Sequence, residues 1–311
     1  MPQIQQLLTK KINIKKIAQL TGHNASIFAL TGGKDTAHFR SGGGEGWVAE
    51  WNFNAPENGQ LIAKVESQIF SLTNLTNENR LVAGNMNGGA HWVDLDNPDA
   101  TKNVLAHKKG IYEFLQIGDF LYSAGGEGML TKWSVSDNKT VESIHLSNQS
   151  LRSLAYAENR KEIAVGASDN HIYLLDSETL SLKKMIANAH ENSVFTVKYH
   201  PNNQHLLSGG RDAHLNIWDL ENDFEKISSQ PAHWFTINAI AFHPDGQLFA
   251  TGSRDKTIKI WDSETFELLK VLDTIRNGCH VNSVNALYWS SFNNYLVSGS
   301  DDRSLIIWEV V

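Results

Sequence analysis

The chain has 311 residues, of which 41% are hydrophobic and 20% are charged, and its formal net charge is −7. This composition is ordinary for a soluble globular protein, and the negative charge argues against general nucleic-acid binding. The single cysteine excludes an intramolecular disulfide framework and suits a reducing compartment. The N-terminus lacks the apolar core of a secretory signal, and no apolar run reaches the roughly 18 residues of a membrane helix. We therefore expect a cytoplasmic protein without membrane contact.

A short extension, residues 1–12, precedes an expected strand at Asn13–Leu20. The rest of the chain is a sevenfold repeat, and the position of Trp218 marks its register. The equivalent positions are Trp51, Val93, Trp133, Leu175, Trp218, Trp261 and Trp308. Successive steps between them are 42, 40, 42, 43, 43 and 47 residues. A period of 20–50 residues indicates a repeat architecture.

Three further columns confirm this register. A histidine stands 28 residues before the mark in four copies and 26 before it in the third: His23, His107, His190, His233 and His280. A hydroxyl residue stands ten before it: Ser41, Ser123, Ser208, Thr251 and Ser298. An acidic residue stands six before it, with Asn87 in its place in the second copy: Glu45, Glu127, Asp169, Asp212, Asp255 and Asp302.

Each copy reads as short strands. In the fifth copy, residues 193–200 and 214–220 alternate, 205–210 is apolar before a glycine turn, and 181–187 is a half-polar strand between copies. Turn residues separate the segments and no helical period appears. Four strands in each of seven copies predict an all-β fold, a seven-bladed β-propeller of four-stranded antiparallel blades over residues 13–311. The last copy ends after its third strand, so we expect the N-terminal strand Asn13–Leu20 to complete and close the last blade.

With histidine to Trp-Asp spacing typical in five of seven copies, the chain resembles the WD-repeat family from about Asn13 to Val311. The resemblance implies a buried, hydrogen-bonded tetrad of His, Ser or Thr, Asp and Trp in a copy. Glu45 and Glu127 stand at the acid position of the first and third copies, so the longer side chain is expected to close the network differently. The second and fourth copies lack most of these residue types, and we expect apolar packing to replace the network there.

The same residues invite a catalytic reading, because Ser, His and Asp form hydrolytic triads. A triad is needed only once and requires an exposed nucleophile, whereas this set recurs and contains a tryptophan, so we interpret it as structural. The histidines show no metal-binding spacing, and the glycine-rich stretch 41–46 precedes a strand rather than the helix of a phosphate cradle. Cys279 has no neighbouring base. We predict no catalytic residues, no metal and no cofactor.

Function is expected in the columns whose residue type changes between copies. The resemblance implies that the residue five after the repeat histidine faces the rim of the central channel on the top face. This column contains Phe28, Phe70, Tyr112, Arg152, Phe195, Asn238 and Asn285. The residue before the turn acid also faces that rim and includes Arg211, Arg254 and Asp301. Aromatic and arginine side chains supply most interface energy, and arginine can clamp a carboxylate or phosphate. The predicted binding residues are therefore Phe28, Phe70, Tyr112, Arg152, Phe195, Arg211 and Arg254.

The sequence thus predicts a monomeric, non-enzymatic scaffold for protein–protein interaction. Its top face would bind a protein or peptide partner with an apolar side chain and an acidic group. Alternatives remain open: a structural subunit of a larger complex that uses its blade sides, an enzyme at the channel mouth, or an RNA-binding protein. The rim columns offer only Asp301 as an acid for catalysis. Stacking aromatics and arginines favour RNA, but the negative net charge argues against it.

Overall fold

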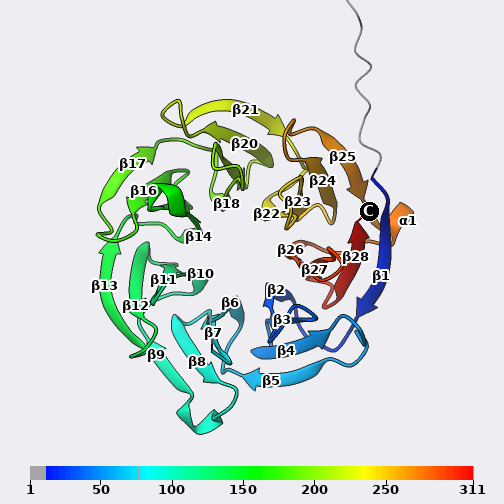
Figure 1. Cartoon of the computed structure of the whole chain (residues 1–311). Coiled ribbons are helices and arrows are strands. Elements are labelled where there is room, and N and C mark those ends of the chain that lie inside the picture. Colours follow the sequence, from blue (N-terminus) through cyan, green and yellow to red (C-terminus); the bar gives the residue numbers. More distant parts are fainter. Residues whose placement is uncertain (1–11, 76–77, 311) are drawn as a thin grey trace, which may run out of the picture.

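Strands dominate the computed structural model, which describes residues 12–75 and 78–310. Within these residues the chain forms seven four-stranded antiparallel sheets around a central channel (Figure 1). The predicted all-β, seven-bladed propeller is confirmed. In blades one to six the innermost strand comes first in the chain, and the outer strand leads to the next blade.

The strands of the first four blades have the following bounds. Blade one contains β2 (Ile27–Gly32), β3 (His38–Gly43), β4 (Trp47–Asn52) and β5 (Gln60–Lys64). Blade two contains β6 (Ile69–Asn74), β7 (Arg80–Asn85), β8 (Gly89–Asp94) and β9 (Lys102–Leu105). Blade three contains β10 (Ile111–Ile117), β11 (Phe120–Gly125), β12 (Met129–Ser134) and β13 (Lys139–His145). Blade four contains β14 (Leu151–Ala157), β15 (Glu162–Ala167), β16 (Ile172–Asp176) and β17 (Leu182–Ile186).

The remaining blades follow the same order. Blade five contains β18 (Val194–Tyr199), β19 (His205–Gly210), β20 (His214–Asp219) and β21 (Glu225–Pro231). Blade six contains β22 (Ile237–Phe242), β23 (Leu248–Ser253), β24 (Ile258–Asp262) and β25 (Leu268–Leu272). Blade seven contains β26 (Val284–Trp289), β27 (Leu296–Ser300), β28 (Leu305–Val310) and β1 (Ile14–Leu20). The short helical turns are η1 (Pro98–Ala100), η2 (Glu158–Arg160) and α1 (Thr274–Asn277).

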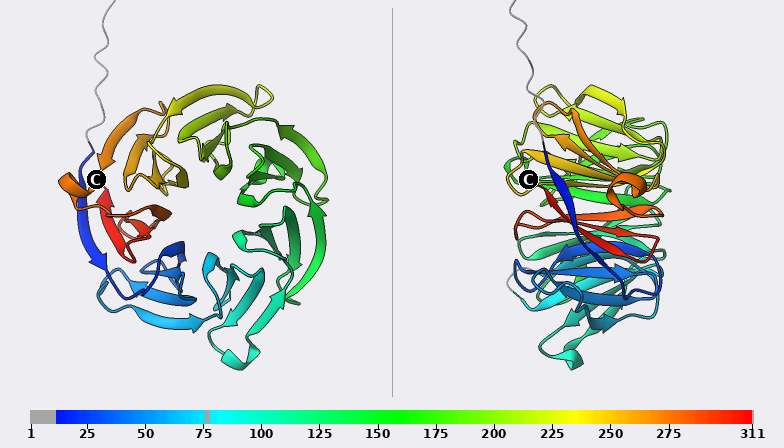
Figure 2. Two further views of the ribbon diagram at one scale, coloured as in Figure 1. Left: turned by 180° about the vertical axis from the view of Figure 1, so that it is seen from behind. Right: turned by 90° about the vertical axis from the view of Figure 1, so that its right-hand side faces the viewer.

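The two ends of the chain close the ring. Strand β1 pairs antiparallel with β28 from Ile14 opposite Val310 to Leu20 opposite Leu305. In Figure 2 the blue N-terminal strand lies along the outer side of the red C-terminal strand. This confirms the expected closure: β1 gives blade seven its fourth strand, so β28 is not left at the edge of its sheet. Of the extension expected over residues 1–12, only Ile12 lies within the described residues.

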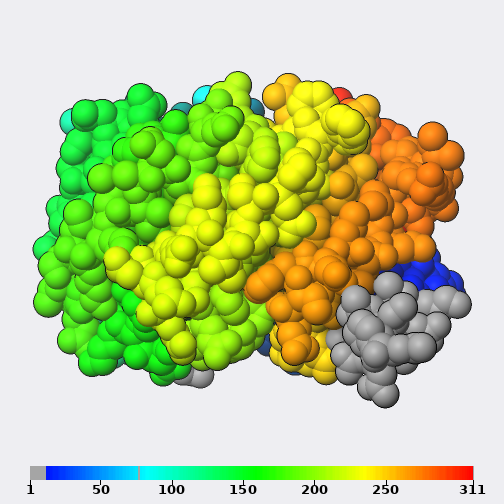
Figure 3. All heavy atoms as spheres, turned by 90° about the horizontal axis from the view of Figure 1, so that it is seen from above, coloured from blue at the N-terminus to red at the C-terminus, as the bar shows by residue number. Residues whose placement is uncertain are grey.

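Burial between blades explains the apolar strand sequences. The described part of the chain contains seven hydrophobic clusters, one at each interface between neighbouring blades. Both faces of a blade are covered, so a middle strand such as β15 is buried at every residue. The outer strand β13 is mostly exposed. Successive blades pack side by side along the edge of the molecule (Figure 3).

Each blade turns from its second to its third strand through a residue in the left-handed region. These residues have φ between 66° and 89°: Gly46, Gly88, Gly128, Asn170, Ala213, Lys256 and Arg303. Glycine and asparagine adopt such φ readily, whereas alanine, lysine and arginine do so at a cost. These turns lie on the same face as the loops that join one blade to the next, because the strands alternate in direction. We call this face the top face.

Candidate functional site

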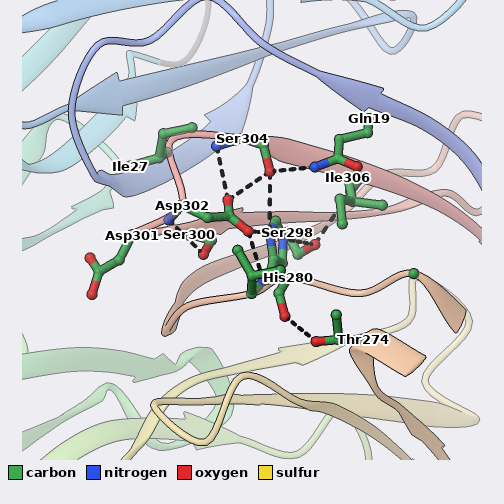
Figure 4. Close-up of polar contacts among 12 residues, drawn as sticks. Gln19, Ile27, Thr274, His280, Ser298, Ser300, Asp301, Asp302, Ser304 and Ile306 are labelled. Carbon is green, nitrogen blue, oxygen red and sulfur yellow. Dashed lines mark hydrogen bonds and ion pairs between the residues drawn. The ribbon is translucent and has the colours of Figure 1, made fainter. Parts of the chain in front are cut away.

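The repeated histidines, hydroxyls and tryptophans form buried hydrogen-bond chains. Figure 4 shows His280, Ser298 and Asp302 of the chain in blade seven. There Trp308 Nε1 donates to Ser298 Oγ over 3.1 Å, and Ser298 Oγ lies 2.9 Å from His280 Nε2. His280 Nδ1 lies 2.9 Å from Asp302 Oδ2. Ser298 is 0% exposed. A buried hydroxyl that already accepts from an indole is not available as a nucleophile, so the chain is structural.

Four other blades contain the same chain within the described residues. The indole-to-hydroxyl distances are 2.8–2.9 Å in blades one, three, five and six. In blades five to seven the acid also accepts backbone amides of the neighbouring loops, as Asp255 does from Trp234 and Thr257. In blades one and three Glu45 Oε2 and Glu127 Oε2 have no hydrogen-bond partner among the described atoms. The longer glutamate does close the network differently, as expected, but at the cost of one unpaired oxygen.

Blades two and four show the expected apolar packing and, in addition, polar networks that were not expected. The apolar residues at the tetrad columns lie in hydrophobic clusters: Ala83, Val93, Val165 and Leu175. In blade two Asn85 Nδ2 donates to Glu66 Oε1 over 2.9 Å and lies 3.0 Å from His91 Nε2. Asn85 Oδ1 accepts the amides of the following turn. In blade four Ser147 and Tyr173 both donate to Asp169, over 2.5 and 2.6 Å. These blades replace the tetrad by other polar networks, because their turn amides still need an acceptor.

Five predicted rim residues form one continuous row around the channel, which we call the channel row: Phe28, Phe70, Tyr112, Arg152 and Phe195. Phe28 contacts Phe70 edge-on at a centroid distance of 5.3 Å, and Phe70 stacks on Tyr112, also at 5.3 Å. The guanidinium carbon of Arg152 lies 4.2 Å from the Tyr112 ring centroid and 5.0 Å from that of Phe195. Each residue is the second of its innermost strand, so the ring geometry brings them together.

The channel row lines a cavity of about 450 Å³ in the centre of the propeller. Asn238 and Asn285, also predicted at the rim, line its remaining side. Asn238 donates to the Val284 carbonyl and Asn285 donates to the Ile27 carbonyl, so these amides hold neighbouring blades together. Within blade seven, Asn285 also donates to Asp301. The acid Asp301 thus accepts a hydrogen bond from an amide, and no basic side chain pairs with it in the described part of the chain.

Arg211 and Arg254 lie on the top face beside this cavity but do not line it. Both side chains are exposed in the turns that follow β19 and β23. The backbone of Arg211 is linked to the channel row by hydrogen bonds. Its amide donates to the Ser193 carbonyl, and Ser193 Oγ donates to the Ser168 carbonyl. Ser168 Oγ in turn accepts from Arg152 Nε.

The sequence interpretation missed two aromatic residues on the same face. Trp234 is 87% exposed and Phe235 is 57% exposed, in the loop that leads into β22. The Arg254 amide donates to the carbonyl of Thr236, which places that arginine beside the pair. The available signal was Trp234 itself: it directly follows a repeat histidine, where other copies carry Asn24, Lys108, Glu191 and Val281.

Other candidate sites are weak. Cys279 is buried, and burial raises the pKa of its thiol to about 12, so the reactive thiolate is suppressed. No group of three or more metal-ligating side chains occurs within the described residues. In that same part of the chain, no helix is long and apolar enough to span a membrane.

Comparisons with known proteins agree with this geometry. Residues 182–219, 224–262 and 269–309 match the family model described as WD domain, G-beta repeat. These segments are the last three copies, each with the outer strand that precedes it. No curated protein matches the chain. Among solved structures, the WD40 β-propeller domain of Doa1 is similar with a TM-score of 0.84 and 16% identity, over 95% of this chain and 96% of that chain. At this identity the likeness shows the fold alone.

Proposed function

Since the chain carries WD40 repeats on a seven-bladed β-propeller, we propose that it is a non-enzymatic scaffold that binds a protein or peptide partner on its top face. The partner segment contributes an apolar side chain and an acidic group. The channel row and the rim arginines form the binding site: Phe28, Phe70, Tyr112, Arg152, Phe195, Arg211 and Arg254. The exposed pair Trp234 and Phe235 extends it. The protein works as a monomeric propeller in the cytoplasm.

The observation that carries the proposal is the continuity of the channel row. Aromatic rings and guanidinium groups that touch one another over five blades give a rigid surface with little side-chain entropy to lose on binding. The row opens into a cavity large enough for one or two partner side chains. Aromatic and arginine anchors of this kind are enriched at protein interfaces.

A capture experiment tests the proposal. The full chain, carrying a photo-crosslinker at Asn24 on the top face, is incubated with lysate of the source cells, and captured proteins are identified by mass spectrometry. We expect Phe70→Ala combined with Trp234→Ala to lose the partner. The matched control, Lys139→Ala with Val141→Ala, changes two exposed residues of the outer strand β13 and should retain it.

If the protein is instead a subunit that binds through its blade sides, the β13 variant should lose the partner and the top-face variant should retain it. Exposed apolar residues do occur on the outer strands, including Leu105, Val141 and Leu182, but they are spread over several blades. Loss of capture in the β13 control, with capture unchanged in the top-face variant, would therefore replace the proposed function by this alternative.

A further inference from the structure

The arginines of the chain divide into two groups by their ion pairs. Four have a carboxylate partner: Arg40, Arg80, Arg160 and Arg276. The other four have no carboxylate within 4.0 Å in the described part of the chain: Arg152, Arg211, Arg254 and Arg303. All four of these lie on the top side of blades four to seven, in β14 or in the turns after β19, β23 and β27. The arginines without a carboxylate partner are thus concentrated on one face of a protein whose net charge is −7.

Arg152 is the unusual member, because it is partly buried. Its guanidinium carbon lies over the rings of both Tyr112 and Phe195, and Nε donates to Ser168 Oγ over 2.9 Å. A cation removed from water without a carboxylate partner is costly, and contact with two rings offsets only part of that cost. Burial lowers the pKa of Arg152, contact with Tyr112 raises it, and the nearby charge of Arg211 lowers it. An anion beside both guanidinium groups would offset the free-energy cost of burying Arg152 and would also reduce its repulsion by Arg211.

The surroundings of Arg152 restrict the direction from which an anion can approach. The rings of Tyr112 and Phe195 lie against the guanidinium, and its Nε donates to Ser168 Oγ. The edge that remains for an anion is the Nη pair, which the Tyr112 side chain also approaches. A planar carboxylate fits that edge with two parallel hydrogen bonds. The backbone of Arg211 is tied to the neighbouring blade through Ser193, and its charge acts on Arg152, so its side chain can approach the same anion from blade five.

We propose that Arg152 and Arg211 form a carboxylate-binding site at the channel mouth, which receives either the chain terminus of the partner or one of its acidic side chains. The site rests on the proposed function and names the group that anchors the partner. The rings of Tyr112 and Phe195 position Arg152. The aromatic rings of blades one to three hold the apolar side chain that accompanies the carboxylate.

The test follows the Nε–Hε resonance of Arg152 by NMR, because the two rings shift it away from other arginines. The probes are two matched peptide pairs: acetyl-Gly-Phe-Gly-Phe with a free or an amidated terminus, and acetyl-Phe-Glu-Phe-amide with its glutamine analogue. In at least one pair, we expect the acidic peptide to shift the Arg152 resonance saturably and its uncharged analogue to leave the resonance unchanged. The pair that responds identifies the source of the carboxylate, terminal or side-chain.

Variants complete the test. Arg211→Gln, at an exposed position, should weaken the binding of the acidic peptide that responds by about tenfold or more, because one charge-assisted contact is lost. Arg303→Gln, an exposed and unpaired arginine in the equivalent turn of blade seven, should leave the affinity unchanged. Equal responses to acid and amide, no response to either acid, or a response to inorganic phosphate alone would each overturn the proposal. Capture lost in Phe70→Ala with Trp234→Ala would still support the proposed function in those cases.

Discussion

Gln19 Nε2 donates a hydrogen bond to Ser304 Oγ over 3.1 Å and so joins two parts of the chain that are 285 residues apart (Figure 4). Ser304 Oγ also donates to Asp302, the acid of the blade-seven tetrad. The closing strand β1 is therefore tied to the internal hydrogen-bond network of the blade as well as to its edge. Closure of the ring and order within blade seven should depend on each other.

Deletion of Asn13–Leu20 tests the closure. It removes the backbone pairing of β1 with β28 and uncovers the core around Leu20. We expect a loss of at least about 5 kcal/mol, which in a domain of this size lowers Tm by roughly 10 °C. Differential scanning calorimetry measures the change. Gln19→Ala, which removes only the side-chain bond, should cost about 1 kcal/mol or less. An unchanged Tm in the deletion would contradict the closure.

Removing the hydroxyl of the blade-seven tetrad, that of Ser298, should lower the free energy of unfolding by more than the loss of one small group suggests. Ser298→Ala leaves Trp308 Nε1 and His280 Nε2 without their shared partner in a fully buried site. Each stranded group costs roughly 1–3 kcal/mol, so urea unfolding should show a loss of about 2–4 kcal/mol. Ser229→Ala, an exposed serine of β21, serves as the control and should change stability by less than about 0.5 kcal/mol. Equal stability of the two variants would refute the structural role of the tetrad.

Acid should destabilise the fold in two stages. Burial lowers the pKa of His91, His200, His205 and His233 below the ordinary 6.5. Such histidines bind protons more readily when unfolded, so stability falls as the pH drops through about 6.5. The pKa of Asp212, Asp255 and Asp302 is also lowered: burial raises it, but hydrogen bonds from histidines and loop groups outweigh that effect. Their contribution is present above pH 3.8 and is lost as the pH falls further toward their folded-state pKa.

Urea unfolding at pH 7.5, 5.5 and 3.5 measures both stages. The free energy of unfolding should decrease from pH 7.5 to 5.5 and again from 5.5 to 3.5. In His205→Asn, one of the partly buried titrating groups is absent, so the first decrease should be smaller than in the unchanged chain. A free energy of unfolding that rises toward pH 5.5 would show that the direction is wrong.

Ala213 offers a substitution that should stabilise the protein. It occupies the left-handed turn position, with φ of 66°, that blades one to three fill with glycine. Ala213→Gly removes the steric cost of that conformation, roughly 1–2 kcal/mol, but adds about 0.4–1 kcal/mol of unfolded-state entropy. We expect a net gain of about 0.5 kcal/mol in chemical denaturation. Ala250→Gly, in the buried strand β23, should instead be destabilising. A loss of stability in Ala213→Gly would mean that its methyl group makes a favourable contact.

Much of the fold could be predicted because most blades meet the same physical requirement with the same residue types at the same spacing. The Trp218 column, the repeat histidines and the turn acids recur since each blade must satisfy the same buried donors and acceptors. The short seventh copy and the strand-like segment Asn13–Leu20 likewise predicted the pairing of β1 with β28. In blades two and four the expected apolar packing is present. Their polar networks were missed, because the partners Glu66, His91 and Tyr173 stand outside the repeating columns.

The sequence by itself determined the period, the strand pattern, the closure and the residue types at the rim, because these depend on spacing along the chain. Only the tertiary structure decided which rim residues touch, because those contacts join different blades. It brought Tyr112 and Phe195 into contact with Arg152, left Trp234 exposed, and kept four arginines away from every described carboxylate. Neighbours across the ring lie about one period apart in sequence, and no local pattern encodes the direction in which their side chains meet.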